Sequence, residues 1–276
     1  MIRKTFLNWK LLLLPIMALL LGLSSCKKDN TTEPTLNEPD YMILASATDN
    51  GVTLEIMAED SFFVGYNRLY FRLKDDQGKQ IKQATISLLP EMDMGTMQHG
   101  CPVENPAELA NADNFDLFEG ALIFQMGTME MMDWKLDIDV TMDRSNHQFS
   151  FDPIHVKMLD EARVKVFTIP GGAKMVASWM FPMNPEVGYN DLGISVHKMT
   201  GPFDFSPVED VVFDLEPWMP SMGHGSPGNV DPLHTELGHY EGIVNFTMGG
   251  PWEVRLDMYD QTGQTLLYDL FFDVTL

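Results

Sequence analysis

The sequence is poor in cysteine and in basic residues. Its 276 residues include only two cysteines, and 18 Lys and Arg stand against 40 Asp and Glu, which gives a formal net charge of −22. Cys26 lies at the end of an N-terminal leader, so Cys101 has no partner for an intramolecular disulfide, and the fold must rest on its hydrophobic core. A strongly acidic surface repels nucleic acid and attracts cations, so we expect no nucleic-acid partner.

Long apolar runs are missing after the first 25 residues. Within those residues, three basic side chains precede an apolar run from Leu11 to Leu23. A basic start, a short apolar run and small residues before the cleavage point are typical of a secretory signal peptide. A transmembrane helix needs ~20 apolar residues, so no later segment is expected to span a bilayer.

The segment Leu23-Ser24-Ser25-Cys26 resembles the lipobox of bacterial lipoproteins, in which the cysteine is lipidated and becomes the new N-terminus. The alternative is an ordinary signal peptide with a chance cysteine. Loss of residues 1–25 removes three basic residues and leaves 15 against 40 acidic ones, a net charge of −25. Residues 26–37 have the polar, Pro-containing composition of a flexible tether. We therefore expect a bacterial cell-envelope protein that is lipid-anchored to a membrane, with the outer membrane favoured, and that faces the periplasm or the cell surface.

No segment of the remaining chain has convincing helical periodicity. Short runs in which apolar and polar residues alternate predict β-strands, separated by turns rich in Gly, Asp and Asn. In the first half the predicted strands are 42–47, 52–57, 69–73, 84–89, 118–126, 134–142 and 149–156. Short strands with turns at this spacing are typical of a β-sandwich.

The same order of motifs then starts again. Val64-Gly65-Tyr66-Asn67 recurs as Val187-Gly188-Tyr189-Asn190, and Trp134 has a counterpart in Trp252. Several motifs recur in the same order, and the number of residues between the two occurrences changes only slightly from one motif to the next. This pattern indicates a tandem duplication with altered loop lengths. We predict that the two tryptophans are the buried aromatic anchors of their copies.

The copies are predicted to be residues 38–157 and 158–276, each long enough to fold as a domain. The predicted fold is all-β, with two tandem immunoglobulin-like β-sandwich domains after the signal peptide and the tether.

Each copy carries a Met-x-x-Met-x-His segment in a loop that follows a strand. Two thioethers and an imidazole suit Cu(I) or Ag(I) far better than Mg, Ca or Mn. Thioethers need no deprotonation and form no disulfides, so they remain ligands in an oxidising compartment. Recognition of a non-metal ligand and simple loop architecture are the alternatives. The predicted copper ligands are Met94, Met97 and His99 and, 125 positions later, Met219, Met222 and His224.

Other metal centres fit these segments less well. Structural zinc requires four Cys or His ligands in a closed tetrahedron. A blue-copper centre requires two His and a Cys. Cys101 does lie near His99, but Ser226 takes its place in the second copy.

Met126, Met248 and His239 are possible additional metal ligands. Met126 and Met248 each come after the strand that follows the motif. If that strand and the motif strand formed a simple hairpin, about eight residues at ~3.3 Å each would place these sulfurs about 25 Å from the motif, in the core. If the intervening loop crosses to the other sheet, the sulfurs could complete the sites. His239 follows only the second motif and would either strengthen that site or remain a solvated loop histidine.

The second copy resembles the YtkA-like domain family, which is related to the FixH-like proteins. Members carry a Met-Pro-x-Met-x-His segment and a later Met-x-x-x-Trp on a small β-sandwich in the bacterial envelope, and they are associated with copper handling. The first copy is similar more loosely, because Gly95 stands in place of the proline and the interval from Met to Trp is longer. The family implies copper by association and implies no catalytic residues. The resemblance rests on Trp218-Met219-Pro220-Ser221-Met222-Gly223-His224, on Tyr240-Glu241-Gly242 and on the segment from Phe246 to Val254.

Two functions from different classes fit these features. The first is a lipid-anchored envelope protein that binds copper, and that buffers Cu(I) or exchanges it with a copper-donating or copper-receiving envelope protein. The second is a surface adhesion or scaffold lipoprotein whose sandwich loops bind a protein or a glycan. An enzyme is not expected, because the sequence shows no Ser/His/Asp or Cys/His arrangement with supporting spacing, no phosphate loop and no nucleotide fingerprint.

Overall fold

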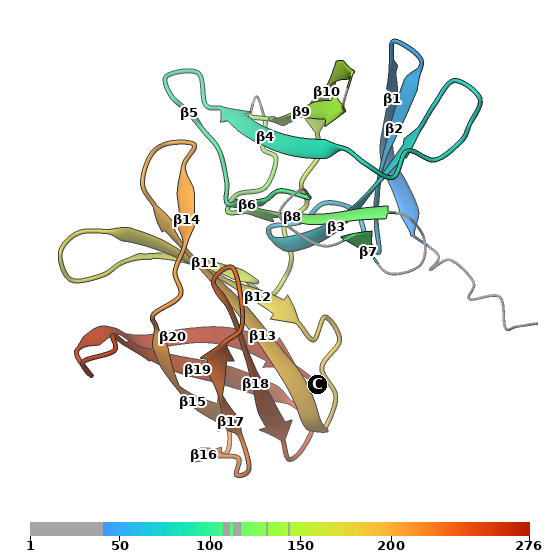
Figure 1. The fold of residues 1–276 in the computed structure, drawn as a ribbon. Coiled ribbons are helices and arrows are strands. Elements are labelled where there is room, and N and C mark those ends of the chain that lie inside the picture. Colours follow the sequence, from blue (N-terminus) through green and yellow to red (C-terminus); the bar gives the residue numbers. More distant parts are fainter. Residues whose placement is uncertain (1–40, 107–110, 113–116, 131, 143) are drawn as a thin grey trace, which may run out of the picture. The chain divides into compact units, whose positions relative to one another are not determined.

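The computed structural model describes residues 41–106, 111–112, 117–130, 132–142 and 144–276 (Figure 1). The predicted signal peptide, the predicted lipidation site at Cys26 and the predicted tether at 26–37 lie outside these residues. Every regular element in the described part of the chain is a β-strand, as predicted. Among these residues no helix is long and apolar enough to cross a membrane. The described residues belong to one compact unit.

The first half of this unit contains two antiparallel sheets. One has the strand order β1-β2-β3-β8-β6, with β7 paired to β8, and the other has the order β10-β9-β4-β5. The strands are β1 (Met42–Asp49), β2 (Val52–Ala58), β3 (Gly65–Lys74), β4 (Thr85–Asp93), β5 (Gln98–His99), β6 (Val103–Glu104), β7 (Asn111–Ala112), β8 (Leu117–Phe124), β9 (Trp134–Met142) and β10 (Ser145–Ile154).

The second half repeats this order, except that the short strand β7 of the first half and the short strand β14 of the second half have no counterparts. Its sheets have the orders β11-β12-β13-β18-β17, with β14 paired to β13, and β16-β15-β19-β20. Each half is therefore a β-sandwich, which confirms the predicted fold class. The strands are β11 (Val164–Thr168), β12 (Lys174–Phe181), β13 (Gly188–Met199), β14 (Phe205–Pro207), β15 (Val212–Met219), β16 (His224–Gly225), β17 (Val230–His234), β18 (His239–Phe246), β19 (Pro251–Tyr259) and β20 (Thr265–Thr275).

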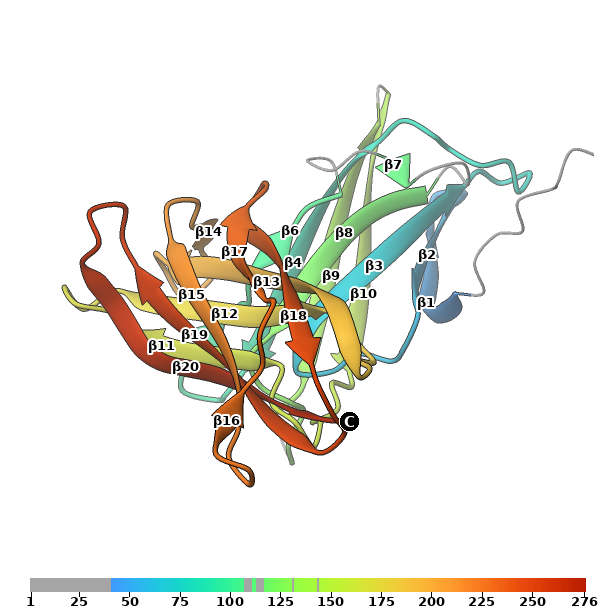
Figure 2. The ribbon, with the colours of Figure 1, turned by 90° about the horizontal axis from the view of Figure 1, so that it is seen from below.

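The alternation of apolar residues explains how the sheets pack. In β9, Trp134, Leu136 and Ile138 are buried while the residues between them are partly exposed, and β19 shows the same pattern from Trp252 onwards. Alternate side chains of a strand point to one face, so these strands bury one face and expose the other. Figure 2 shows the two layers of the second half, β12-β13-β18 and β15-β19-β20.

The chain changes sheets between the Met/His hairpin and the next long strand. In the first half β4 and β5 lie in one sheet, β6 and β8 lie in the other, and the chain returns to the first sheet with β9. β9 begins at Trp134, which is paired with Met92 near the end of β4. The loop from β8 to β9 therefore lies at the same end of the sandwich as the Met/His hairpin, which is the crossing arrangement that the sequence left open.

Candidate metal sites

In the second half, the Met/His segment closes a short hairpin. Met219 ends β15, His224 begins β16, and the two are paired directly across the strands. Directly opposed residues project from the same face with Cβ atoms about 5 Å apart, so this thioether and this imidazole can reach one metal ion. The backbone N–H groups of Met222 and Gly223 donate to the carbonyl oxygen of Met219. Gly223 has a φ of +66°, a conformation that favours glycine.

In the first half, the residue opposite the histidine is Met92 and not Met94. β4 pairs Met92 with His99, and the hairpin then extends by one further residue pair before its loop begins at Met94. The repeat in the sequence aligned Met94 with Met219, but the strand register places Met92 in the equivalent position. The physical reason is that a hairpin one pair longer contains two more residues between the methionine and the histidine.

The flanking residues support this correspondence. Pro90 and Pro217 each lie two positions before the paired methionine. A Cβ on Gly100, the residue after His99, would lie 3.1 Å from the carbonyl oxygen of Pro90, and a Cβ on Gly225 would lie 3.0 Å from that of Pro217. Both glycines thus allow the same close approach of two strands. The proline two residues earlier is the sequence feature that could have identified Met92.

A tryptophan completes the same cross-strand row in each half. Met92 is paired with His99 on one side and with Trp134 on the other. The imidazole and indole rings of this row meet edge to face, with centroids 5.5 Å apart. In the second half the register of β15 and β19 places Trp252 beside Met219, and the rings of His224 and Trp252 are 5.9 Å apart. We call these two sets the first row (Met92, His99, Trp134) and the second row (Met219, His224, Trp252).

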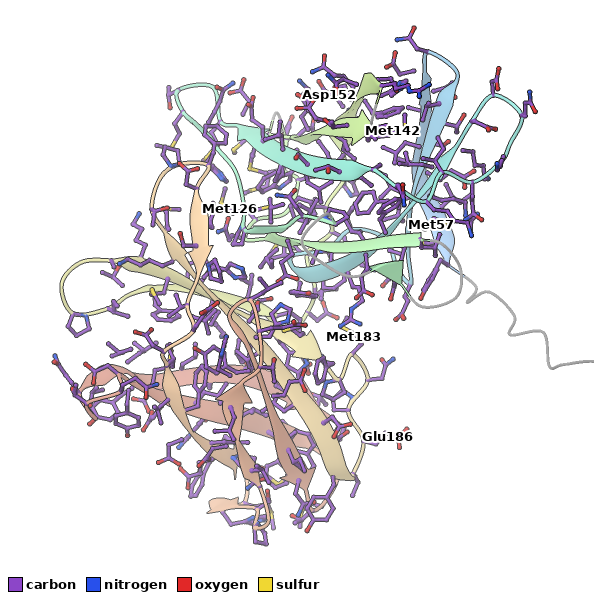
Figure 3. All side chains as sticks on the ribbon, viewed as in Figure 1. Met57, Met126, Met142, Asp152, Met183 and Glu186 are labelled. Atoms are coloured by element: carbon purple, nitrogen blue, oxygen red, sulfur yellow. The ribbon has the colours of Figure 1, made fainter. Side chains whose placement is uncertain are left out.

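Met126 and Met248 lie next to the rows. Trp134 and Trp252 are buried, as predicted, and their indole N–H groups donate to the carbonyl oxygens of Met126 and Met248 over 2.9 and 3.0 Å. Met126 is partly buried against the core (Figure 3), whereas Met248 is 39% exposed. A simple hairpin would have placed both residues at the end of the sandwich away from the Met/His hairpin. They lie at the same end instead, because the chain crosses to the other sheet after β5 and after β16.

The backbone holds both histidines in one tautomer. Nδ1 of His99 lies 2.9 Å from the carbonyl oxygen of Gly100, and Nδ1 of His224 lies 2.8 Å from that of Gly225. Because a carbonyl oxygen only accepts, Nδ1 carries the proton and Nε2 offers a lone pair. Histidines that bind metals commonly donate their other N–H to a backbone carbonyl in this way. Nε2 of His99 is buried and has no hydrogen-bond partner, which costs about 1–3 kcal/mol unless a ligand satisfies it.

The remaining predicted ligands differ in exposure. Met219 is 2% exposed and Met92 is fully buried, so the row thioethers lie at the edge of the core. Met97 and Met222 are 61% and 62% exposed, and their loop positions leave them room to move toward a metal ion. Met94 is partly buried and packs against the core of the first half.

The donors that the rows present fit a soft monovalent cation. Each row offers one buried thioether and one imidazole nitrogen, with an exposed loop methionine and a further methionine nearby. Sulfur and imidazole donors of this kind suit Cu(I). Among the residues that the structure describes, no group of three or more His, Cys, Asp or Glu side chains could hold a metal ion. The candidate sites therefore depend on methionine.

His239 is not brought to the second row. It begins β18, and the far end of that strand, toward Trp252, lies about 23 Å away at ~3.3 Å per residue. Its Nε2 instead lies 2.7 Å from Oε1 of Glu104, and the other carboxylate oxygen, Oε2, accepts a hydrogen bond of 2.6 Å from the hydroxyl of Tyr66. Burial and the neighbouring carboxylate raise the pKa of Tyr66 well above its usual value. These three side chains form a buried polar contact between the two halves.

Cys101 follows the first hairpin but is enclosed in the core at 1% exposure. Burial raises the pKa of its thiol far above the usual value, so the sulfur is held in the protonated form, which is a poor metal ligand. Its counterpart Ser226 donates a hydrogen bond to the carbonyl oxygen of Asn245.

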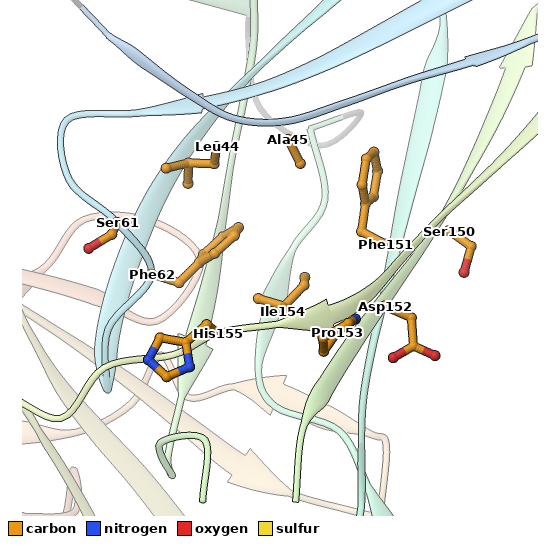
Figure 4. A pocket seen from close by; sticks show the side chains of 10 residues that line it. All are labelled: Leu44, Ala45, Ser61, Phe62, Ser150, Phe151, Asp152, Pro153, Ile154 and His155. Atoms are coloured by element: carbon orange, nitrogen blue, oxygen red, sulfur yellow. The ribbon is translucent and has the colours of Figure 1, made fainter.

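A cavity of about 470 Å³ lies elsewhere in the first half, between β1 and β10. Leu44, Phe62 and Phe151 point into it, and Ser61 and His155 lie at its margin (Figure 4). Its lining includes none of the residues of the first row.

These features define a protein of two β-sandwiches, each with a row of methionine, histidine and tryptophan at one end. The sequence model of the YtkA-like family matches residues 182–257, which lie within the second half. The matched range contains the whole second row, together with Met222 and Met248. No curated protein matches the chain.

Three solved structures are similar to the chain at low identity. The adhesin FdeC of Escherichia coli is 14% identical with a TM-score of 0.25, and the match covers 84% of this chain and 66% of that one. Domains 5–6 of the S-layer protein SbsC are 9% identical with a TM-score of 0.28, covering 86% and 98%. A C-terminal fragment of intimin, in complex with the intimin-binding domain of its translocated receptor, is 9% identical with a TM-score of 0.23, covering 84% and 64%. The chain thus spans about two thirds of the adhesin and intimin chains, and these likenesses carry no argument about function.

Proposed function

We propose that this chain is a lipid-anchored protein of the bacterial cell envelope that binds Cu(I) at its two rows, and that it buffers the metal or passes it to another envelope protein. One observation carries the proposal. In each half, the histidine donates Nδ1–H to the carbonyl of the next glycine, which leaves Nε2 as a free lone pair beside a methionine paired directly across the strands.

The chemistry of the rows supports exchange of the metal rather than permanent storage. A thioether and an imidazole provide two fixed donors at the edge of the core. The exposed loop residues Met97 and Met222 can provide a third donor without disturbing the core. A metal held partly by a mobile surface ligand can be taken over by a partner that presents sulfur or imidazole of its own.

Two further features agree with this function. Residues 182–257 match the YtkA-like family, whose members are associated with copper handling, and the first half has the same strand order and an equivalent row. The excess of 40 acidic over 18 basic residues attracts cations. The lipobox-like segment ending at Cys26 supports attachment to a membrane through lipid.

The proposal is tested by titrating residues 30–276 with Cu(I) under anaerobic, reducing conditions against a chromophoric Cu(I) chelator. This range retains the compact unit of the described residues. We expect two equivalents for the parent, one for His99→Asn or His224→Asn, and none for the double variant. Asparagine keeps an N–H donor near the position of Nδ1 but lacks Nε2, so it removes the ligand with little change to the hairpin. His155→Asn, at an exposed position outside both rows, is the matched control and should retain two equivalents.

Circular dichroism of each variant verifies that the fold is kept. The proposal is wrong if the parent takes up no Cu(I) in this competition, or if the double variant still binds two equivalents. A macromolecular ligand captured equally by the parent and by a double variant that retains both equivalents would support the adhesion or scaffold function instead.

A further inference from the structure

The connection between β8 and β9 is longer than its counterpart between β18 and β19, and the added residues include methionines. It spans residues 125–133 in the first half, whereas the connection in the second half spans residues 247–250. The short connection contains one methionine, Met248, and Met129 and Met132 belong to the residues added in the first half. Whatever these two methionines do is therefore specific to the first half.

Met129 and Met132 face each other across a tight turn. The N–H of Met129 donates to the carbonyl oxygen of Met132 over 3.1 Å, and the N–H of Met132 donates to the carbonyl oxygen of Met129 over 3.0 Å. The two residues form an antiparallel bridge. Residues that exchange both hydrogen bonds in this way have Cα atoms about 5.5 Å apart and project from the same face. Their two thioethers can therefore bind one metal ion.

A third thioether lies against the same segment. A Cβ on Gly127 would lie 2.9 Å from Sδ of Met158, so this sulfur packs on the backbone two residues before Met129. Thr128 joins the two segments. Its N–H donates to the carbonyl oxygen of Val156, and the N–H of Val156 donates to Oγ1 of Thr128, both over 2.9 Å. The backbone therefore keeps Met158 beside the methionine-containing connection.

The second half has no sulfur at the equivalent position. Gly249 corresponds to Gly127, and a Cβ there would meet the backbone carbonyl oxygen of Leu276 at 3.5 Å. Leu276 is joined to Gly250 by two backbone hydrogen bonds, one in each direction. Met129, Met132 and Met158 thus have no counterparts in the second half.

These three side chains are accessible to solvent. Met129 and Met158 are 50% and 69% exposed, and Met132 is partly exposed. A methionine side chain is unbranched and has three rotatable bonds, so the sulfurs can converge on an ion without moving the core. Glu130 and Asp133 are exposed beside the paired methionines, and their negative charge attracts a cation. Three thioethers select a soft cation such as Cu(I).

We propose that Met129, Met132 and Met158 form a third Cu(I) site, which consists of thioethers alone and lies on the surface of the first half. This site goes beyond the function proposed above, because it uses no residue of either row. Thioethers are neutral donors, so we expect the third site to bind Cu(I) less tightly than a row that also provides an imidazole nitrogen. The connection leads directly into Trp134 of the first row, so an ion bound here lies at the same end of the sandwich as that row.

The third site is counted by equilibrium dialysis of residues 30–276 against Cu(I) that is kept in solution by acetonitrile under anaerobic conditions. Acetonitrile competes far more weakly than the chromophoric chelator, which should empty the thioether site and count the rows alone. We expect three equivalents for the parent and two for a triple variant that lacks the three sulfurs. Leucine keeps a similar apolar volume while removing the sulfur. The triple variant is Met129→Leu, Met132→Leu and Met158→Leu.

Two further variants complete the dialysis experiment. The double variant His99→Asn and His224→Asn should take up one equivalent, because the thioether site needs no histidine. The matched control combines Met42→Leu and Met183→Leu, which change exposed methionines outside the rows and outside the third site. This control should retain three equivalents, as the parent does.

The ligands themselves are identified with Ag(I), another soft monovalent cation, in the double histidine variant. Its methionine methyl groups are labelled with carbon-13 and observed by NMR. The resonances of Met129, Met132 and Met158, assigned from the single leucine variants, should shift together as Ag(I) is added. The resonances of Met42 and Met183 should stay in place.

The possible failures are distinguishable. Two equivalents for the parent in dialysis, or three for the triple variant, overturn the thioether site and leave the rows untouched. No uptake by the double histidine variant also overturns it, because the three sulfurs would then act only together with a row. Absence of uptake in the chelator competition, with one equivalent in dialysis that the triple variant lacks, overturns the proposed function and supports the third site.

Discussion

Replacing His197 with leucine is expected to remove a large part of the acid sensitivity of this fold. His197 lies in β13 and is 2% exposed, and its Nδ1 is buried without a hydrogen-bond partner. The pKa of His197 is lowered to about 4, mainly by burial; the nearby Glu104 opposes this change and His239 adds to it. The folded protein therefore holds His197 neutral under conditions in which an exposed histidine is already protonated.

The sign and the size of the effect follow from proton linkage. The unfolded chain binds this proton near the ordinary value of 6.5 and the folded chain near 4, so stability is lost as the pH falls through that window. One pKa unit corresponds to ~1.36 kcal/mol. The full contribution of His197 is thus about 3 kcal/mol, of which about 2 kcal/mol develops between pH 7 and pH 4.5.

The assay is urea unfolding at about pH 7 and pH 4.5, followed by tryptophan fluorescence. Between the two conditions, the parent should lose about 2 kcal/mol more free energy of unfolding than His197→Leu does. His234→Leu, at an exposed histidine in β17, should keep the pH dependence of the parent. Equal losses in the parent and in His197→Leu would refute the reasoning, because every other titrating group is common to both proteins.

Three further predictions concern burial around the rows. Met219→Ala should lower the free energy of unfolding by about 2–5 kcal/mol, since the side chain is buried, whereas Met222→Ala should lower it by less than about 0.5 kcal/mol; equal values in denaturant unfolding would contradict the burial assigned to this hairpin. Cys101 should not react with a thiol reagent in the native protein, because burial raises the pKa of its thiol, and it should react once the chain is unfolded in denaturant; rapid native labelling is the opposing outcome. Gly100→Ala should cost about 1–3 kcal/mol, as its Cβ would crowd Pro90 and Phe203; a thermal melt unchanged from that of the parent would show that the neighbours yield freely.

Local sequence pattern was sufficient for the longer strands of the first half, whereas the short strands β5, β6 and β7 were not predicted. The alternation from Trp134 to Met142 predicted β9 at its observed bounds, and Trp134 and Trp252 are buried as predicted. These features depend on residue type and on the alternation of side chains between the two faces of a strand. That alternation is the same wherever the strand lies in the sheet. The Met-x-x-Met-x-His segments were predicted as loops that follow strands, and the structure shows that each lies in a short hairpin.

The repeat counted along the sequence aligned one methionine of the first half differently from the strand register. A constant offset aligned Met94 with Met219, but the first hairpin is one pair longer, so Met92 faces His99. An offset counted along the chain cannot show where added residues lie within a hairpin. Pro90 and Pro217 each lie two positions before the methionine that is paired with the histidine. Aligning the two prolines therefore identifies the equivalent methionines correctly, whereas the constant offset does not.

The amino-acid sequence by itself determined the all-β class, the buried tryptophans and the presence of two methionine- and histidine-rich segments after strands, because each depends on residues close together in the chain. Only the tertiary structure decided which side chains meet at the hairpins. Crossing of the chain between sheets brought Met126 and Met248 to the rows, strand register selected Met92, and the far end of β18 carried His239 to Glu104. Contacts between strands are set by register and by the order of strands in the sheet, and neither is specified by the local pattern of any one strand.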